Sequence, residues 1–118
     1  MDTIQLSSNF DFGNAIALAV HDQIDEAIAQ VVQDYIEKPE LRDGFACIAN
    51  ICYEKGHYEI SLQLFEQDHL LNRLSPAYRQ VYAYLLAKNN RMKESKTAIS
   101  RAYSEDPSLM YGYSLIDQ

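Results

Sequence analysis

The chain has 118 residues, of which 47% are hydrophobic and 23% charged, and it carries a formal net charge of −7 at pH 7. This length and balance predict one folded domain with its own hydrophobic core, and they exclude a disordered or low-complexity chain. The sequence pI near 4.8 argues against general nucleic-acid binding, which needs a basic face.

The N-terminal sequence and the hydropathy pattern give no sign of export or of a membrane span. Residues 1–5 have neither the basic start nor the long apolar stretch of a signal peptide. The longest apolar run, residues 15–20, is far shorter than the roughly 20 residues that cross a bilayer. Two cysteines without an export signal are typical of a reducing compartment. We therefore expect a cytoplasmic protein with no membrane partner.

Charge is unevenly distributed along the chain. Residues 1–40 carry a net charge of −7, whereas residues 76–101 carry +5. Such stretches are typical of solvated helix faces, and they would also orient a charged partner along the molecule. The sequence leaves both interpretations open.

The first two predicted pairs of helices cover about residues 8–41 and 42–75. In the first pair, Asp22 is suited to a tight turn that follows a helix. In the second pair, Gly56 is suited to the equivalent turn. We expect two antiparallel helices on either side of each turn.

The third predicted pair covers about residues 76–109 and turns at Asn90. It begins with Ser75 as an N-cap and Pro76 at the first helical position, a combination that favours a helix start. A last helix is predicted over about residues 107–116, where it would cover the apolar flank of the third pair. Strand signals are absent from the whole chain.

The three pairs share one repeating register, which is the strongest pattern in the sequence. The turn positions are Asp22, Gly56 and Asn90, which are equally spaced. The small residues are Ala15, Ala49 and Ala83 in the first helices and Ala27, Ser61 and Ser95 in the second helices. The large apolar residues that follow in the second helices are Val31, Phe65 and Ile99. Small side chains let two helices cross closely, and large ones fill the gap to the next helix.

This register resembles the tetratricopeptide repeat (TPR), a helix-turn-helix unit of about 34 residues. The resemblance covers nearly the whole chain. It implies an all-α fold, in which residues 1–118 form a single domain of three TPR repeats and a C-terminal capping helix in a right-handed superhelical array. Some positions depart from the TPR pattern. Asp11 and Arg79 stand where the second repeat has Phe45, Asp68 replaces a small residue, and Arg73 replaces a proline.

Aromatic and sulfur-containing residues divide between core and surface in this register. Tyr58 and Tyr82 are predicted to lie in the core of the repeats, and Cys52 falls on a core position. Tyr53 and Tyr84 fall instead on the positions that the TPR resemblance assigns to a binding groove.

The sequence contains no constellation of residues that would carry catalysis. Its glycines are isolated, so no phosphate-binding loop is present. Cys47 and Cys52 would lie about 140° apart on a helix, which is poor geometry for sharing a metal. His21 and His57 flank turns, where a solvated histidine is ordinary. We therefore expect no enzyme activity, no cofactor and no metal site.

The TPR resemblance implies that the first helix of each repeat lines a concave groove. Carried onto this sequence, the partner-binding residues are Phe12, Ile16, Ala19, Val20, Ala46, Asn50, Tyr53, Gln80, Tyr84 and Ala87. This set is mostly apolar and aromatic, so it suits the apolar face of an amphipathic helix. The basic clamp with which some TPR proteins grip acidic chaperone tails is absent, because Phe12, Ile16, Ala77 and Val81 occupy its positions.

Size, repeat number, charge and groove character together look like the small chaperones of bacterial type III secretion that hold the needle subunit. The resemblance implies that the groove wraps an amphipathic helix of the needle protein and prevents premature polymerisation. It also implies a second partner, a small helical co-chaperone. Two alternatives remain, a generic TPR adaptor for protein–protein interaction and a chaperone of type III translocator proteins.

Overall fold

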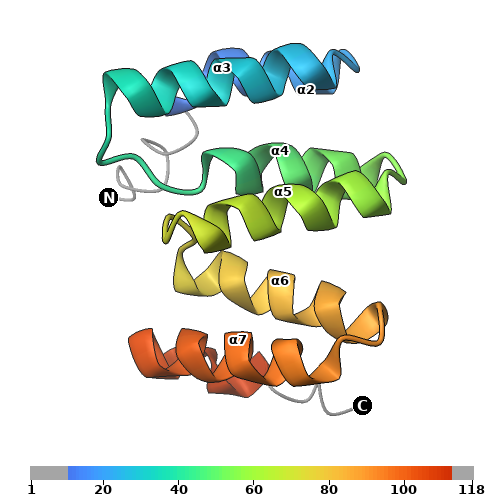
Figure 1. Cartoon of the computed structure of the whole chain (residues 1–118), viewed down its shortest axis with the longest axis vertical. Coiled ribbons are helices and arrows are strands. Elements are labelled where there is room, and N and C mark those ends of the chain that lie inside the picture. The colour runs from blue at the N-terminus through green and yellow to red at the C-terminus, as the bar shows by residue number, and fades with distance from the viewer. Residues whose placement is uncertain (1–10, 113–118) are drawn as a thin grey trace. The chain divides into compact units, whose positions relative to one another are not determined.

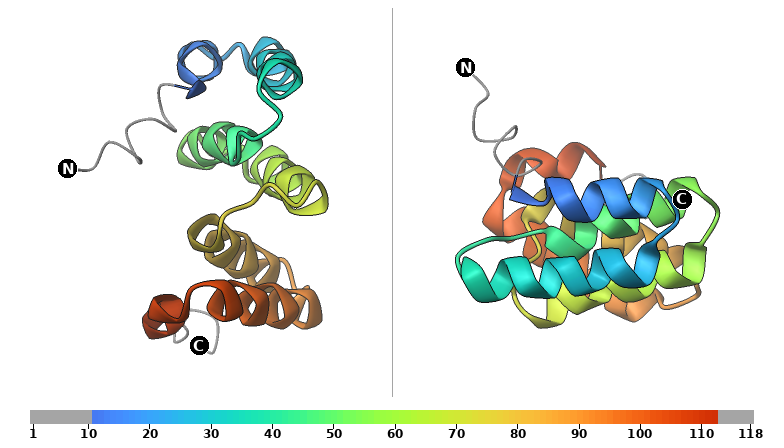
Figure 2. Two further views of the ribbon diagram at one scale, coloured as in Figure 1. Left: turned by 90° about the vertical axis from the view of Figure 1, so that its left-hand side faces the viewer. Right: turned by 90° about the horizontal axis from the view of Figure 1, so that it is seen from above.

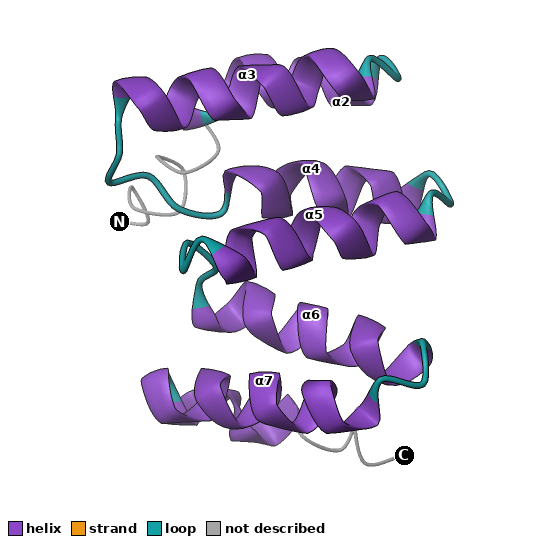
Figure 3. Ribbon diagram, viewed as in Figure 1, coloured by secondary structure: helices purple, strands orange, loops and turns teal. Residues whose placement is uncertain are grey.

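The computed structural model describes residues 11–112, and every regular element within that range is helical (Figures 1 and 3). The elements are α2 (Gly13–Val20), α3 (Ile24–Glu37), α4 (Gly44–Glu54), α5 (Tyr58–Leu70), α6 (Pro76–Lys88), α7 (Met92–Glu105) and the 3₁₀ helix η1 (Pro107–Gly112). The prediction of an all-α fold is therefore confirmed.

The chain divides into two compact units at residues 73 and 74. The first unit contains α2 to α5, and the second contains α6, α7 and η1. The helix predicted over residues 107–116 begins as the 3₁₀ helix η1, and its predicted last residues lie outside the described range.

The turns within the three hairpins are alike. Asp22, Gly56 and Asn90 all have a left-handed backbone, with φ of 64°, 86° and 63°. In each hairpin the next residue donates its N–H to a carbonyl five positions back, at 2.8–2.9 Å, as in a Schellman motif. The donor and acceptor pairs are Gln23 and Leu18, His57 and Cys52, and Arg91 and Leu86. The predicted turn positions, equally spaced along the chain, are thus confirmed.

The helix crossings also repeat. The hydroxyl of Ser61 donates to the carbonyl of Ala49 at 2.7 Å, and the hydroxyl of Ser95 donates to the carbonyl of Ala83 at 2.6 Å. All four residues are fully buried. The first hairpin has alanines at both equivalent positions, Ala15 and Ala27, which are also fully buried. The predicted small residues therefore do lie where the helices of each hairpin meet.

In the first unit, α2 packs against α3, both pack against α4, and α4 packs against α5. Figure 2 shows α2 alongside α3 and α4 alongside α5. A line of aromatic rings joins the first three helices. Tyr35 makes edge-to-face contacts with Phe12 at 5.7 Å and with Phe45 at 5.6 Å between ring centroids. Val31 and Phe65 are fully buried, as the register predicts.

In the second unit, α6 packs against α7, and η1 contacts both. Tyr82 and Ile99 lie in its core as predicted. Arg79 is fully buried and forms an ion pair with Glu105 of α7. The charge of Arg79 thus joins α6 to α7.

The prediction that Tyr58 lies in the core is wrong. Its side chain is 60% exposed at the first residue of α5. The ring packs edge-on against Tyr53, with 5.1 Å between the centroids, so this pair lies at the surface of the second hairpin. Cys52, the residue before Tyr53, is fully buried as predicted.

Within residues 11–112, no helix is both long enough and apolar enough to cross a bilayer.

The packing around Gly44 gives a direct test of the first unit. A Cβ at this position would lie 2.6 Å from Phe12 Cε1 and 2.7 Å from Val31 Cγ1. We expect Gly44→Ala to lower the free energy of unfolding by about 1–3 kcal/mol because the core there has no room. Urea unfolding followed by circular dichroism measures this change.

Gly13→Ala is the matched control, because a Cβ at Gly13 meets no atom within 4 Å. This substitution should leave the free energy of unfolding unchanged or raise it by up to about 1 kcal/mol. Equal stability of both variants would contradict the close approach of α2, α3 and α4 around Gly44.

Candidate functional site

Three of the predicted partner-binding residues belong to the core and offer no surface to a partner. Phe12, Ala19 and Ala46 are all buried. Phe12 packs against Tyr35 and beside Gly44, and the backbone of Ala46 is bonded to a carboxylate of α5. The prediction is corrected here, because the adjoining helices cover these positions of α2 and α4.

The other predicted residues of the first unit remain accessible. Val20 is 51% exposed, Tyr53 is 39% exposed, Asn50 is exposed and Ile16 is half-buried. They lie on α2 and α4, which pack against each other, and we call these four residues the α2–α4 surface. Its side chains are mainly apolar or aromatic.

Lys55 ties the turn ends of the first two hairpins together. Its Nζ donates to the carbonyl of Val20 at 2.9 Å and pairs with Asp22 Oδ1 at 2.7 Å. The hydrogen bond and the charge of Lys55 lower the pKa of Asp22. The α2–α4 surface is thus held at one end by a link between helices far apart in sequence.

The predicted residues of the second unit lie along α6. Gln80, Tyr84 and Ala87 are half-buried and spaced four and three residues apart, so they share one face of that helix. Lys88 Nζ lies 5.4 Å from the centroid of the Tyr84 ring. We call this set the α6 stripe.

The first unit also has a groove between α3 and α5 that the sequence analysis did not predict. It consists of two adjoining hollows of about 310 and 320 Å³, which share Val32, Phe45 and Gln67. The lining residues are Ile28, Val32, Tyr35, Ile36, Phe45, Ile60, Gln63, Leu64, Gln67, Leu71 and Arg73. We call this feature the α3–α5 groove.

A signal for the α3–α5 groove was present in the sequence. Val31 and Tyr35 face the core, yet each is followed by an exposed aliphatic residue, Val32 and Ile36. Such doubled positions widen the apolar stripe of α3 beyond what one neighbouring helix covers. The TPR resemblance assigns binding only to the first helix of each pair, and the α3–α5 groove lies between second helices.

A buried carboxylate lies beneath the α3–α5 groove. Asp68 of α5 is fully buried and accepts a hydrogen bond from the Tyr35 hydroxyl at 2.7 Å. Its second oxygen accepts the backbone N–H of Ala46 at 2.8 Å, while the Tyr35 hydroxyl accepts the N–H of Gly44 at 2.8 Å. The first N–H groups of a helix have no partner within it. Side chains of α3 and α5 therefore cap α4.

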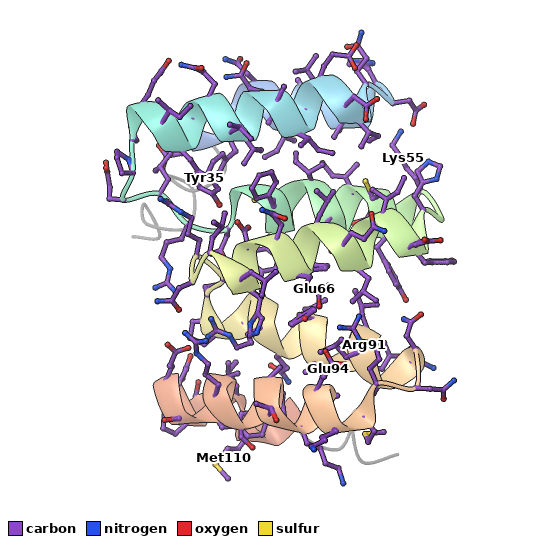
Figure 4. All side chains as sticks on the ribbon, in the orientation of Figure 1. Tyr35, Lys55, Glu66, Arg91, Glu94 and Met110 are labelled. Atoms are coloured by element: carbon purple, nitrogen blue, oxygen red, sulfur yellow. The ribbon has the colours of Figure 1, made fainter. Side chains whose placement is uncertain are left out.

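Arg73 also contacts the cluster of Tyr35 and Asp68. Its guanidinium lies 4.3 Å from the centroid of the Tyr35 ring. Its Nη1 donates to the carbonyls of Pro39 and Leu41 at 2.6 and 2.8 Å, so it holds the loop between α3 and α4. Figure 4 shows Tyr35 projecting from α3 toward the start of α4. Arg73 and Tyr35 also line one end of the α3–α5 groove.

This cluster has the features of a structural site. Burial and the charge of Asp68 raise the pKa of Tyr35, so its hydroxyl stays protonated and able to donate. The Asp68 carboxylate is fully buried and therefore out of reach of a substrate. Among residues 11–112, no three His, Cys, Asp or Glu side chains gather closely enough to hold a metal ion.

A comparison of the chain with known protein families, with curated proteins and with solved structures finds no significant match.

The pKa of Asp68 predicts how stability depends on pH. Burial raises this pKa from its ordinary value of 3.8 to about 6, although the hydrogen bonds from Tyr35 and Ala46 oppose the shift. The folded chain therefore binds this proton more tightly than the unfolded chain does. The stabilisation is fully present below about pH 4 and is lost as the pH rises through about 6.

Asp68→Asn, which cannot titrate, is the matched control. Between about pH 4 and pH 7, we expect the native chain to lose about 2 kcal/mol more unfolding free energy than this variant loses. Urea unfolding at a series of pH values measures the difference. The opposite slope would show that the hydrogen bonds to the carboxylate outweigh its desolvation.

Proposed function

We propose that this chain is a TPR-type repeat protein whose function is to bind an amphipathic helix of another protein. The observation that supports the proposal is the repetition of three hairpins at equal intervals along the chain. They share a left-handed turn residue, the same capping hydrogen bond and small buried residues at the crossing. Arrays of such hairpins commonly present extended binding surfaces.

The accessible apolar side chains support a helical partner. Val20 and Tyr53 are exposed on α2 and α4, and Tyr84 is half-buried on α6. A helix with aliphatic residues along one face would cover such side chains from water. Each Leu- or Ile-sized side chain that becomes fully buried contributes about 1.5–3 kcal/mol. Ordering and association costs remove part of this gain, so the complex would be reversible.

The partner we propose is the needle subunit of a type III secretion system, held in the cytoplasm before export. This choice depends on the resemblance of the sequence to the needle-subunit chaperones. A subunit whose apolar helix drives self-assembly stays unassembled while that helix is buried elsewhere. A small helical co-chaperone is the second partner in this proposal. The proposal also includes the arrangement of the three hairpins as TPR repeats in a right-handed superhelix.

Photo-crosslinking in the native host identifies the partner. A benzophenone amino acid in place of Tyr53, and separately in place of Tyr84, keeps an aromatic ring at each position. We expect mass spectrometry of the adducts to find a small helical secretion subunit. Adducts with a membrane-inserting secreted protein would show that the partner is a translocator protein and not the needle subunit. Adducts with proteins unrelated to secretion would overturn the secretion assignment and leave a TPR adaptor.

Charge substitutions test the binding surface. Because Val20 and Tyr53 are exposed, we expect Val20→Glu and Tyr53→Glu to keep the helical circular dichroism of the native chain. Each should weaken binding of the crosslinked partner by more than about tenfold, because a carboxylate would be buried against apolar side chains. Titration calorimetry with the purified partner measures the loss.

Leu70→Glu introduces the same charge at a residue that is 73% exposed on α5. This control should bind the partner within about twofold of the native chain. Unchanged binding by both surface variants would exclude the α2–α4 surface as the binding site.

A further inference from the structure

The α3–α5 groove is a second apolar surface that the proposed function does not use. Ile28, Val32 and Ile36 line it from α3 at intervals of four residues, so they follow one another along about 12 Å of the helix. Ile36 is 67% exposed, and Val32 is also exposed. Aliphatic side chains left accessible along two adjoining hollows are typical of a site for a partner.

The opposite wall and the floor are also largely apolar. Ile60, Leu64 and Leu71 line the groove from α5 and the turn that follows it, and the ring of Phe45 forms the floor. The amide side chains of Gln63 and Gln67 stand between them. α3 and α5 both pack against α4, which buries Leu64 and leaves Val32, Ile36 and Ile60 exposed. The shape and lining therefore suit a ridge of aliphatic side chains.

The two helices that wall the groove carry side-chain charges of one sign, and the cation Arg73 lies beyond the end of α5. α3 and α5 together contain seven Asp and Glu residues and no Lys or Arg. Residues 11–73 as a whole carry twelve acidic and four basic side chains, a net charge of −8. A groove walled by two such helices attracts cationic groups and disfavours anionic ones.

Three of the seven acidic side chains lie in the first turns of the two helices, and the other four, Asp34, Glu37, Glu66 and Asp68, lie in their second halves. α3 and α5 run in the same direction, so their first turns lie at the same end of the groove (Figure 1). Asp25 and Glu26 lie in the first turn of α3, and Glu59 lies in the first turn of α5; all three are exposed. Arg73 lies at the opposite end, where its guanidinium is bonded to two carbonyls.

We propose that the α3–α5 groove binds a short amphipathic helix of a partner protein, one with an aliphatic ridge flanked by Lys and Arg. The ridge would fill the two hollows between α3 and α5. Its basic flanks would lie against the acidic first turns of both helices. Apolar anchors supply most of the affinity in this mode of binding, and the charges orient the helix and select it. This surface is distinct from the α2–α4 surface and lies wholly within the first unit.

A peptide of defined design tests this proposal on the full chain. The probe is a helical peptide of about sixteen residues with Leu at positions i, i+4, i+7 and i+11 and Lys on both flanks. One comparison peptide replaces every Lys with Glu, and a second scrambles the first to remove the apolar face. We expect the Leu/Lys peptide to bind at least about tenfold more tightly than either. Equal binding of the Glu peptide or of the scrambled peptide would overturn the proposal.

Two matched variants locate the site. Ile36→Lys places a charge inside the groove, whereas Leu70→Lys adds the same charge at a residue of α5 that does not line it. Both residues are largely exposed, so both variants should fold. We expect Ile36→Lys to weaken binding of the Leu/Lys peptide by at least about tenfold and Leu70→Lys by less than about threefold. If both variants weakened peptide binding equally, the peptide would be bound through net charge alone, and the proposal would be overturned.

Tyr53→Glu separates this inference from the proposed function. This variant alters the α2–α4 surface and leaves the α3–α5 groove intact, so the Leu/Lys peptide should bind it as it binds the native chain. A loss of peptide binding in Tyr53→Glu would place the peptide on the α2–α4 surface and contradict the proposal. The peptide result does not depend on which partner the crosslinking experiment identifies.

Discussion

The first unit depends on one buried carboxylate. Asp68 comes from α5, accepts a hydrogen bond from the Tyr35 hydroxyl of α3 and accepts an N–H from the first turn of α4. Three helices are thus joined by one side chain, which accepts one of the N–H groups at the start of α4 that have no partner within the helix, while Tyr35 accepts another. A buried ionised group without these partners would cost several kcal/mol, so the three helices hold their positions together.

The same arrangement explains why a groove exists. Tyr35 and Asp68 bond to each other and both reach the start of α4, so α3 and α5 are fixed together at that end of α4. Phe45 lies between them as the floor, and Arg73 closes one end. Val32 and Ile36 of α3 and Ile60 of α5 stay accessible along the groove. The polar cluster and the apolar groove are two consequences of one packing arrangement.

The hairpins and their connections are stabilised in different ways. Within the second and third hairpins, a serine hydroxyl bonded to an alanine carbonyl holds the crossing, and a left-handed residue closes each of the three turns. Between the first two hairpins, the Lys55–Asp22 ion pair depends on a carboxylate at a turn position where the other hairpins have Gly56 and Asn90. Repetition thus builds the hairpins, while individual residues give each surface its own chemistry.

The sequence by itself determined the local features. The turns at Asp22, Gly56 and Asn90 could be predicted because a left-handed position restricts which residues fit. The small residues at the crossings, such as Ala49 and Ser61, could be predicted because close helix approach excludes large side chains. Only the tertiary structure decided that Phe12 and Ala46 are core, that Tyr58 is exposed and that Asp68 caps α4. Whether an apolar face meets a neighbour or solvent depends on how separate helices pack, and residues as distant as Tyr35 and Asp68 meet only once the chain has folded.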